Sequence, residues 1–288
     1  TRNIRWFFLF LLSLIWGSSF ILIKKGLLGL SPLQLGSYRI VISSIFIFCI
    51  GYKTLKGISK AQWKWLAVSG FLGTFFPSFL FAFAETEVDS TVASILNSLV
   101  PLNTILLGLI IFKIKSSRFQ IFGVLLGFVG ASLLILEGAE LNPDQNYWYA
   151  GFIVLATLMY AANVNIIKKY LYGVPPVAIA TANFIVIFIP ALGVLLFSNG
   201  FSASTSQSEA FLPSLGCVVI LSVFGTALAK IVFNKLILIS TPVFASSVTY
   251  LMPIVALFWG VLDGEVFDVF QGCAALLILC GIYLANKN

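Results

Sequence analysis

The stretch WGSSFILIKK, residues 16–25, has a counterpart at residues 160–169, which reads YAANVNIIKK. Both stretches end in a lysine pair after an apolar run, and a proline follows each of them seven residues later, at Pro32 and at Pro176. The two copies are 144 residues apart, which is half the length of this 288-residue chain. This spacing indicates that one unit was duplicated and raises the question of what the unit is.

The composition predicts that the unit lies in a lipid bilayer. Hydrophobic residues make up 60% of the chain and charged residues only 9%, whereas a soluble domain carries about 25% charged residues. The chain contains no histidine, so the commonest general base and metal ligand are absent. The basic residues are dispersed between apolar runs, which is typical of membrane topology rather than of a nucleic-acid surface.

Ten apolar segments of about 20 residues, the length that crosses a bilayer, follow one another along the chain. They cover residues 5–24, 33–52, 63–84, 90–112, 119–136, 148–167, 176–197, 211–236, 242–262 and 268–285. We therefore predict an all-α membrane protein with ten transmembrane helices.

The distribution of charge predicts the orientation of these helices. With the N-terminus in the cytoplasm, 13 of the 17 basic residues fall on the cytoplasmic side, and all ten acidic residues fall on the other side. Only the basic bias is used by the positive-inside rule. Both termini are then expected in the cytoplasm, together with the loops near residues 56, 115 and 168. The loops near residues 87, 140, 205 and 264 are expected outside.

Further matches show how far the duplication extends. ASILNSLVP at residues 93–101 matches ASSVTYLMP at residues 245–253, and FQ occurs at residues 119–120 and again at 270–271. The repeat unit is therefore five helices, over residues 1–140 and 147–288. Because five is odd, the two copies cross the membrane in opposite directions. Secondary transporters are built in this way, with the substrate site near the midplane between the repeats.

The same residues resemble the EamA-like branch of the drug/metabolite transporter superfamily. The resemblance covers essentially the whole chain, and its residues are Trp16, Gly17, Ser18, Ser19, Phe20, Lys24, Pro32, Arg39, Pro101, Pro253, Gln271 and Gly281. It implies a ten-helix carrier that exports amino acids or other small metabolites. It also implies a central cavity lined by helices 1–4 and 6–9, with helices 5 and 10 at the side.

We expect the polar and aromatic residues of this central region to bind the substrate. The candidates are Trp16, Ser19, Arg39, Asn97, Tyr160, Asn163, Asn183, Lys230, Thr249 and Tyr250. The second copy departs from the first, since Tyr160 replaces Trp16 and Asn183 replaces Arg39. The two halves of the cavity should therefore differ chemically.

Two charges within the apolar segments, Arg39 and Lys230, are candidates for attracting a substrate carboxylate. Alternatively, both side chains extend to the nearby interface. A further alternative for Arg39 is a structural ion pair or a hydrogen bond to helix-end carbonyls. No Asp or Glu is expected deep in a helix. Glu85 is the nearest candidate for proton coupling, which the sequence supports only weakly.

Pro101 and Pro253 are predicted hinges. A proline within a helix removes the hydrogen bond to the carbonyl four residues earlier, which belongs to Asn97 in one copy and to Thr249 in the other. Each copy would then offer a free backbone acceptor beside a polar side chain. The prediction is a kinked helix lining a wet cavity, and the alternative is ordinary polar contact between packed helices.

The leading hypothesis is a secondary carrier that exports amino acids or related zwitterionic or anionic compounds by alternating access. The alternative is a non-transporting integral membrane protein, either an enzyme or a receptor or assembly factor. We expect no enzymatic activity, cofactor or metal, and no nucleic-acid partner. The expected location is the inner membrane of a bacterium. Gly123 and Gly127 predict close helix packing within a monomer or, alternatively, a homodimer seam.

Overall fold

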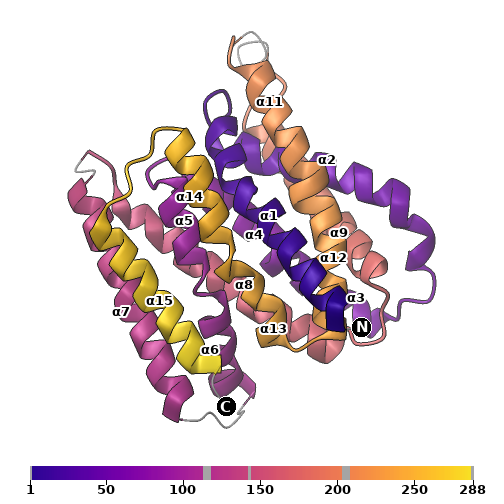
Figure 1. Cartoon of the computed structure of the whole chain (residues 1–288). Coiled ribbons are helices and arrows are strands. Elements are labelled where there is room, and N and C mark those ends of the chain that lie inside the picture. The colour runs from indigo at the N-terminus through magenta and orange to yellow at the C-terminus, as the bar shows by residue number, and fades with distance from the viewer. Residues whose placement is uncertain (1, 113–117, 142–143, 203–207, 287–288) are drawn as a thin grey trace.

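The computed structural model describes residues 2–112, 118–141, 144–202 and 208–286, and within them the chain forms helices and turns with no strand (Figure 1). The predicted loops near residues 115 and 205 lie outside the described residues. An all-helical fold is compatible with a bilayer, because a helix satisfies its backbone hydrogen bonds internally.

The helices follow the predicted segments closely. In chain order they are α1 (Arg2–Gly26), α2 (Pro32–Gly51), η1 (Tyr52–Leu55), α3 (Lys60–Gly70), η2 (Phe71–Phe75), α4 (Phe76–Ala84), α5 (Ser90–Asn97), α6 (Val100–Phe112), α7 (Arg118–Leu141), η3 (Tyr147–Tyr149), α8 (Ala150–Tyr170), α9 (Pro176–Phe197), α11 (Phe211–Ile220), η4 (Leu221–Leu228), α12 (Ala229–Ile239), α13 (Pro242–Ser246), η5 (Ser247–Tyr250), α14 (Met252–Leu262) and α15 (Val269–Asn286).

Nine continuous helical stretches among the described residues are long and apolar enough to cross a membrane. They correspond to the first nine predicted segments. The tenth predicted segment contains a shorter apolar helix, Val269–Gly281. The protein is thus a multi-pass membrane protein, and a tenth crossing stays a prediction.

Prolines and capping residues set where several helices begin. Ser31 caps α2 through a capping box with Gln34, and Pro32 occupies the first turn of the same helix, where its missing N–H has no intrahelical partner to lose. Pro176 starts α9 in the same way. The prolines that follow the two copies of the opening stretch therefore both start a helix.

Four of the predicted segments are locally irregular. The third and eighth contain π-helical turns, η2 and η4. The fourth is interrupted between α5 and α6, and the ninth passes through η5 between α13 and α14. Irregular turns of this kind occur often at functional sites.

Two helices, α7 and α15, lie side by side at the lower left of Figure 1. They pack closely because glycines face each other: a Cβ at Gly281 would lie 2.6 Å from the Gly123 carbonyl and 2.7 Å from the Gly127 nitrogen. A Cβ at Gly130 would lie 2.9 Å from the Ala274 carbonyl. These glycines are used for packing within the chain, as one of the two interpretations of the sequence predicted.

Candidate functional site

A cavity of about 100 Å³ lies in the interior of the protein. It is lined by Trp16, Ser19, Phe20, Ile23, Arg39, Gly73, Thr74, Ser78, Phe81, Asn97, Val100, Tyr160, Asn163, Val164, Gly225, Thr226, Lys230, Phe233, Ser246, Thr249 and Met252. Every predicted segment except the fifth, seventh and tenth contributes to this wall. Sites for small molecules usually measure about 300–1,000 Å³, so the cavity in this structure is smaller than a typical ligand site.

Eight of the ten predicted site residues line the cavity. They are Trp16, Ser19, Arg39, Asn97, Tyr160, Asn163, Lys230 and Thr249. Their roles in binding stay a prediction, but the structure brings them together from six different segments of the chain.

Asn183 and Tyr250 are placed elsewhere. Asn183 is fully buried against α3, where its amide donates a 2.6 Å hydrogen bond to the Leu66 carbonyl. It occupies the position that corresponds to Arg39 in the first copy, but it holds two helices together rather than lining the cavity. Tyr250 ends η5 and does not line the cavity either.

The two intramembrane cations are both buried and both line the cavity. Arg39 Nε donates to Thr226 Oγ1 at 2.7 Å, and Lys230 Nζ donates to the Gly73 carbonyl at 2.8 Å. The Lys230 side chain is only 6% exposed overall, so it turns inward rather than extending to the interface. The lining residues thus include two basic side chains and no Asp or Glu.

The π-helical turns supply two lining glycines, Gly73 and Gly225, that the sequence reasoning missed. A Cβ at Gly73 would lie 2.5 Å from Asn163 Nδ2 and 2.7 Å from Lys230 Nζ, and one at Gly225 would lie 2.7 Å from Ser19 Oγ. The missed signal was a Gly-Thr pair that occurs at residues 73–74 and again 152 residues later, at residues 225–226.

The carbonyls of these two glycines accept hydrogen bonds from the cavity wall. The Gly73 carbonyl accepts a hydrogen bond from the Lys230 ammonium, and the Gly225 carbonyl accepts one from the Trp16 indole N–H at 2.8 Å. A π-turn leaves carbonyls without their usual helical partner, so each needs a donor in an apolar environment. One half of the protein thus supplies a cation and the other half a neutral donor.

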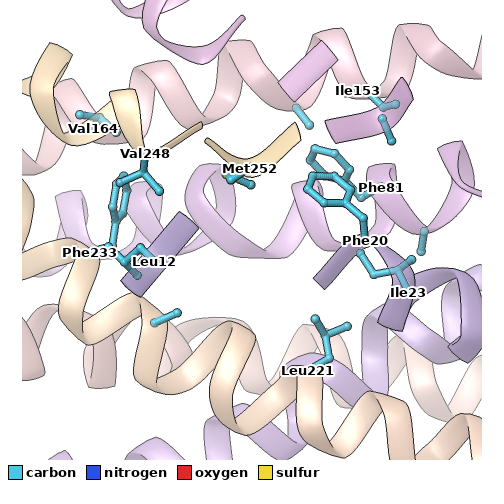
Figure 2. Packing of buried hydrophobic residues seen from close by; sticks show 14 of the residues in the cluster. Leu12, Phe20, Ile23, Phe81, Ile153, Val164, Leu221, Phe233, Val248 and Met252 are labelled. Carbon is cyan, nitrogen blue, oxygen red and sulfur yellow. The ribbon is translucent and has the colours of Figure 1, made fainter. Parts of the chain in front are cut away.

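Aromatic side chains close the two sides of the cavity. Phe20 contacts Phe81 edge to face with ring centroids 5.8 Å apart, and Phe81 stacks on Tyr160 at 6.1 Å. Trp16 contacts Phe233 at 4.9 Å. Figure 2 shows Phe20 beside Phe81 on one side, Phe233 beside Leu12 on the other, and Met252 between the two groups.

The predicted hinge prolines follow breaks in both helices. Pro101 lies in the first turn of α6, and Pro253 lies in the first turn of α14. The Thr249 carbonyl, which Pro253 deprives of its helical partner, accepts a 2.9 Å hydrogen bond from Ser98 Oγ at the other break. Asn97 and Thr249 line the cavity, and Ser98 joins the two helices by this hydrogen bond. The role of the two prolines as hinges stays a prediction.

One end of the molecule carries an ion-pair network, which we call the acidic end: residues 85–90 and 263–268 with the last turn of α1. Lys24 pairs with Glu265 at 2.8 Å and with Asp263 at 3.4 Å, and Lys25 also pairs with Asp263. Glu265 additionally accepts hydrogen bonds from the backbone and side chains of Ser90 and Thr91. It thereby ties α1 to the N-terminus of α5.

Protonation of Glu265 would weaken this network. Burial alone would raise the pKa of the Glu265 carboxyl, but the hydrogen bonds from Lys24, Ser90 and Thr91 outweigh burial and hold its pKa below the ordinary value. The pKa of Asp263 is also low, because its bonds and charge interactions with Lys25 and Lys24 outweigh burial. Both carboxyls are therefore ionised near neutral pH.

The opposite end, the basic end, contains residues 52–64, 168–176 and 235–241. Here Lys168, the counterpart of Lys24, donates to the carbonyls of Ile237 and Leu238 at 3.2 Å and of Ser240 at 2.6 Å. A cation at the last carbonyls of a helix is favourable because it satisfies groups that lack an intrahelical partner. The two matching lysines thus differ in their partners: Lys24 forms ion pairs at the acidic end, and Lys168 bonds backbone carbonyls at the basic end.

Comparison with known proteins agrees with this architecture. The sequence model of the EamA-like transporter family matches residues 4–136 and again residues 147–287. The chain belongs to the EamA-like transporter family. Its members named below are transporters, so this protein is a membrane transporter.

The relatives come from bacteria and archaea. The chain is 26% identical over 286 residues to YedA of Escherichia coli K12, an uncharacterized inner membrane transporter, covering 96% of this chain and 89% of that protein. It is 24% identical over 288 residues to an uncharacterized transporter of Archaeoglobus fulgidus, covering 99% of each. A solved crystal structure shares the fold with a TM-score of 0.68 at 15% identity, covering 99% of this chain and 97% of that one.

Proposed function

We propose that this protein is a secondary carrier of the inner membrane of a bacterium. It exports amino acids or related zwitterionic and anionic compounds by alternating access. The observation that carries this proposal is the pair of buried cations, Arg39 and Lys230, on the wall of a central cavity whose lining contains no acidic side chain. A charge buried in a membrane protein is expensive and marks a functional position.

The wall can recognise both ends of an amino acid. A guanidinium binds a carboxylate through two hydrogen bonds, whereas an ammonium acts as a compact point charge. Asn97 offers a complementary group, since its Oδ1 is buried without a hydrogen-bond partner among the described residues. This oxygen can accept a hydrogen bond from a substrate ammonium, and Trp16 and Tyr160 can contact the side chain.

Alternating access is supported by matched features of the two halves. The π-turn at Gly73 corresponds to that at Gly225, the break before Pro101 to that before Pro253, and α7 to α15. An inverted repeat provides two equivalent arrangements in which either end closes. In this proposal the acidic end faces outward, and the basic end faces the cytoplasm together with both termini.

The function is tested by reconstituting the purified protein into vesicles loaded with unlabelled amino acids. Uptake of a labelled amino-acid mixture by exchange is then measured, with matched vesicles of Arg39→Gln as control. We expect exchange by the wild type that Arg39→Gln loses and that competing carboxylates inhibit more strongly than competing amines. Equal inhibition by amines and carboxylates would contradict the assignment of the two cations.

The orientation is tested with single cysteines on a background without Cys49, Cys217, Cys273 and Cys280. An impermeant thiol reagent added to intact cells should label a cysteine at Gly264 but not one at Gly57. Both glycines are exposed and lie in turns with positive φ, so the two sites are comparable in accessibility. Labelling at Gly57 alone would reverse the proposed topology.

A further inference from the structure

Glu85 immediately follows α4 and continues the face of that segment that lines the cavity. Its backbone N–H donates to the Phe81 carbonyl at 2.9 Å, so it caps the C-terminus of the helix. Thr74, Ser78 and Phe81 line the cavity, and Glu85 follows them at the helical spacing of four, three and four residues. It therefore lies one turn beyond Phe81, toward the acidic end.

The Glu85 carboxyl is buried without a partner. The residue is only 7% exposed, and neither carboxyl oxygen has a hydrogen-bond partner among the described residues. An ionised carboxylate in such a place would lose its hydration without gaining a hydrogen bond from the protein, so burial favours the neutral acid. Glu87, two residues later, differs because it accepts a 2.8 Å hydrogen bond from the Asn146 backbone.

Charged groups stand near Glu85, but each is already engaged. Lys24 of α1, Arg39 of α2 and Glu265 of the α14–α15 connection act on it electrostatically, and Tyr160 of α8 stacks on Phe81 and acts on Arg39. Lys24 pairs with Glu265 and Asp263, and Arg39 donates to Thr226. An ionised Glu85 would have to draw one of these cations away from its present partner.

We propose that Glu85 is a proton-binding site whose proton drives the exchange of the carried compound, a step that rests on the proposed carrier function. In the structure described here the Glu85 carboxyl is buried and unpartnered among the described residues, an environment that favours the neutral acid. When the opposite end opens, the proton leaves, and the carboxylate attracts Lys24 or Arg39.

This attraction links the proton to the gate. If Lys24 turns to the ionised Glu85, it leaves Glu265 and Asp263, and the tie between α1 and α5 weakens. The acidic end then opens, the compound departs, and a proton from that side forms an O–H bond with the carboxylate. One proton is bound at one side and the same proton is released at the other, so no further reactant is needed.

Infrared spectroscopy of the full-length protein in lipid vesicles tests the site directly, and the proton is its own probe. The carbonyl stretch of a protonated carboxyl is distinct from the carboxylate bands. We expect a protonated-carboxyl band that titrates in the wild type, is absent in Glu85→Gln and persists in the matched control Glu87→Gln. Glutamine has the shape of the neutral acid, so the variant should fold, and Glu85→Asp should restore a titrating band.

Transport in the same vesicles tests the coupling. A proton gradient should accelerate movement of the labelled amino-acid mixture severalfold in the wild type and in Glu87→Gln. Glu85→Gln should keep exchange at equal pH on both sides but should not respond to the gradient.

Three results would overturn the proposal: no protonated band in the wild type, a band that survives in Glu85→Gln, or a full response to the gradient in that variant. If the wild type moves no amino acid at all, the proposed function fails separately. The infrared result then still decides whether Glu85 binds a proton.

Discussion

The two copies of the opening stretch, residues 16–25 and 160–169, occupy equivalent positions but make different contacts. Trp16 donates to the Gly225 carbonyl, whereas the Gly73 carbonyl takes its hydrogen bond from Lys230. Lys24 pairs with carboxylates, whereas Lys168 bonds carbonyls. The two matching stretches thus make chemically different contacts, both at the cavity and at the two ends of the molecule.

The sharpest test compares Arg39 with Asn183, which occupies the matching position. Arg39→Gln removes a cavity cation and should weaken substrate affinity by about 10- to 100-fold, since charged hydrogen bonds contribute about 1.5–3 kcal/mol. Asn183→Ala removes a buried bond to Leu66 and should lower the free energy of unfolding by about 1–3 kcal/mol without changing affinity. Substrate affinity and thermal unfolding would be measured for both variants. A loss of affinity in Asn183→Ala with unchanged affinity in Arg39→Gln would mean that the two residues have the opposite roles.

The next test compares the two glycines of the π-turns. Gly73→Ala should reduce exchange by on the order of tenfold, since overpacking costs about 1–3 kcal/mol and the added Cβ would crowd both Asn163 and Lys230. Gly225→Ala should have a smaller effect, because its Cβ would crowd chiefly the Ser19 hydroxyl and Leu221. Equal exchange rates for both variants at matched abundance would mean that the space beside these two glycines does not control transport.

A third test compares the two lysines that close the ends. Lys24→Gln should raise the labelling rate of a cysteine at Phe20 from outside severalfold, because a partly exposed ion pair contributes only up to about 1 kcal/mol. Added salt should raise the wild-type rate but not that of Lys24→Gln, because salt screens ion pairs. Lys168→Gln should leave this salt dependence intact. If added salt still raises the labelling rate in Lys24→Gln, the Lys24 ion pairs are not what closes the acidic end.

Closure of the acidic end should also weaken at acid pH, whereas closure of the basic end should not. Because the folded-state pKa of Glu265 is depressed, its contribution to closure is complete above the ordinary value of about 4.3. It is lost as the pH falls through the folded-state value. Labelling of the Phe20 cysteine should rise in that acid range, and Glu265→Gln should be open already and respond less. If closure does not depend on Glu265, the labelling rates of the wild type and of Glu265→Gln will show the same pH dependence.

The smallest effect is expected from the two prolines. Pro101→Ala and Pro253→Ala each restore a backbone donor, but the breaks are also held by the bond from Ser98 to Thr249. We expect each single variant to lower exchange a few-fold while the protein reaches the membrane normally. Combining either proline variant with Ser98→Ala should lower exchange further. Parental rates in both single variants would show that the prolines are not hinges.

The sequence by itself determined the class of the protein and much of the site. Span length, the scarcity of charge and the matched segments follow from local composition, because the bilayer imposes apolar runs of fixed length. Trp16, Arg39, Asn163 and Lys230 could be predicted because polar groups in such runs are costly and therefore informative.

The tertiary structure alone decided what each polar group contacts. Arg39 and Asn183 hold matching places in the sequence, yet one lines the cavity and the other binds Leu66. Glu85 lies at a predicted helix end, but only the packing of α1, α4 and the α14–α15 connection leaves its carboxyl buried and unpartnered among the described residues. Partners distant in the sequence set these differences, and a local pattern carries no information about them.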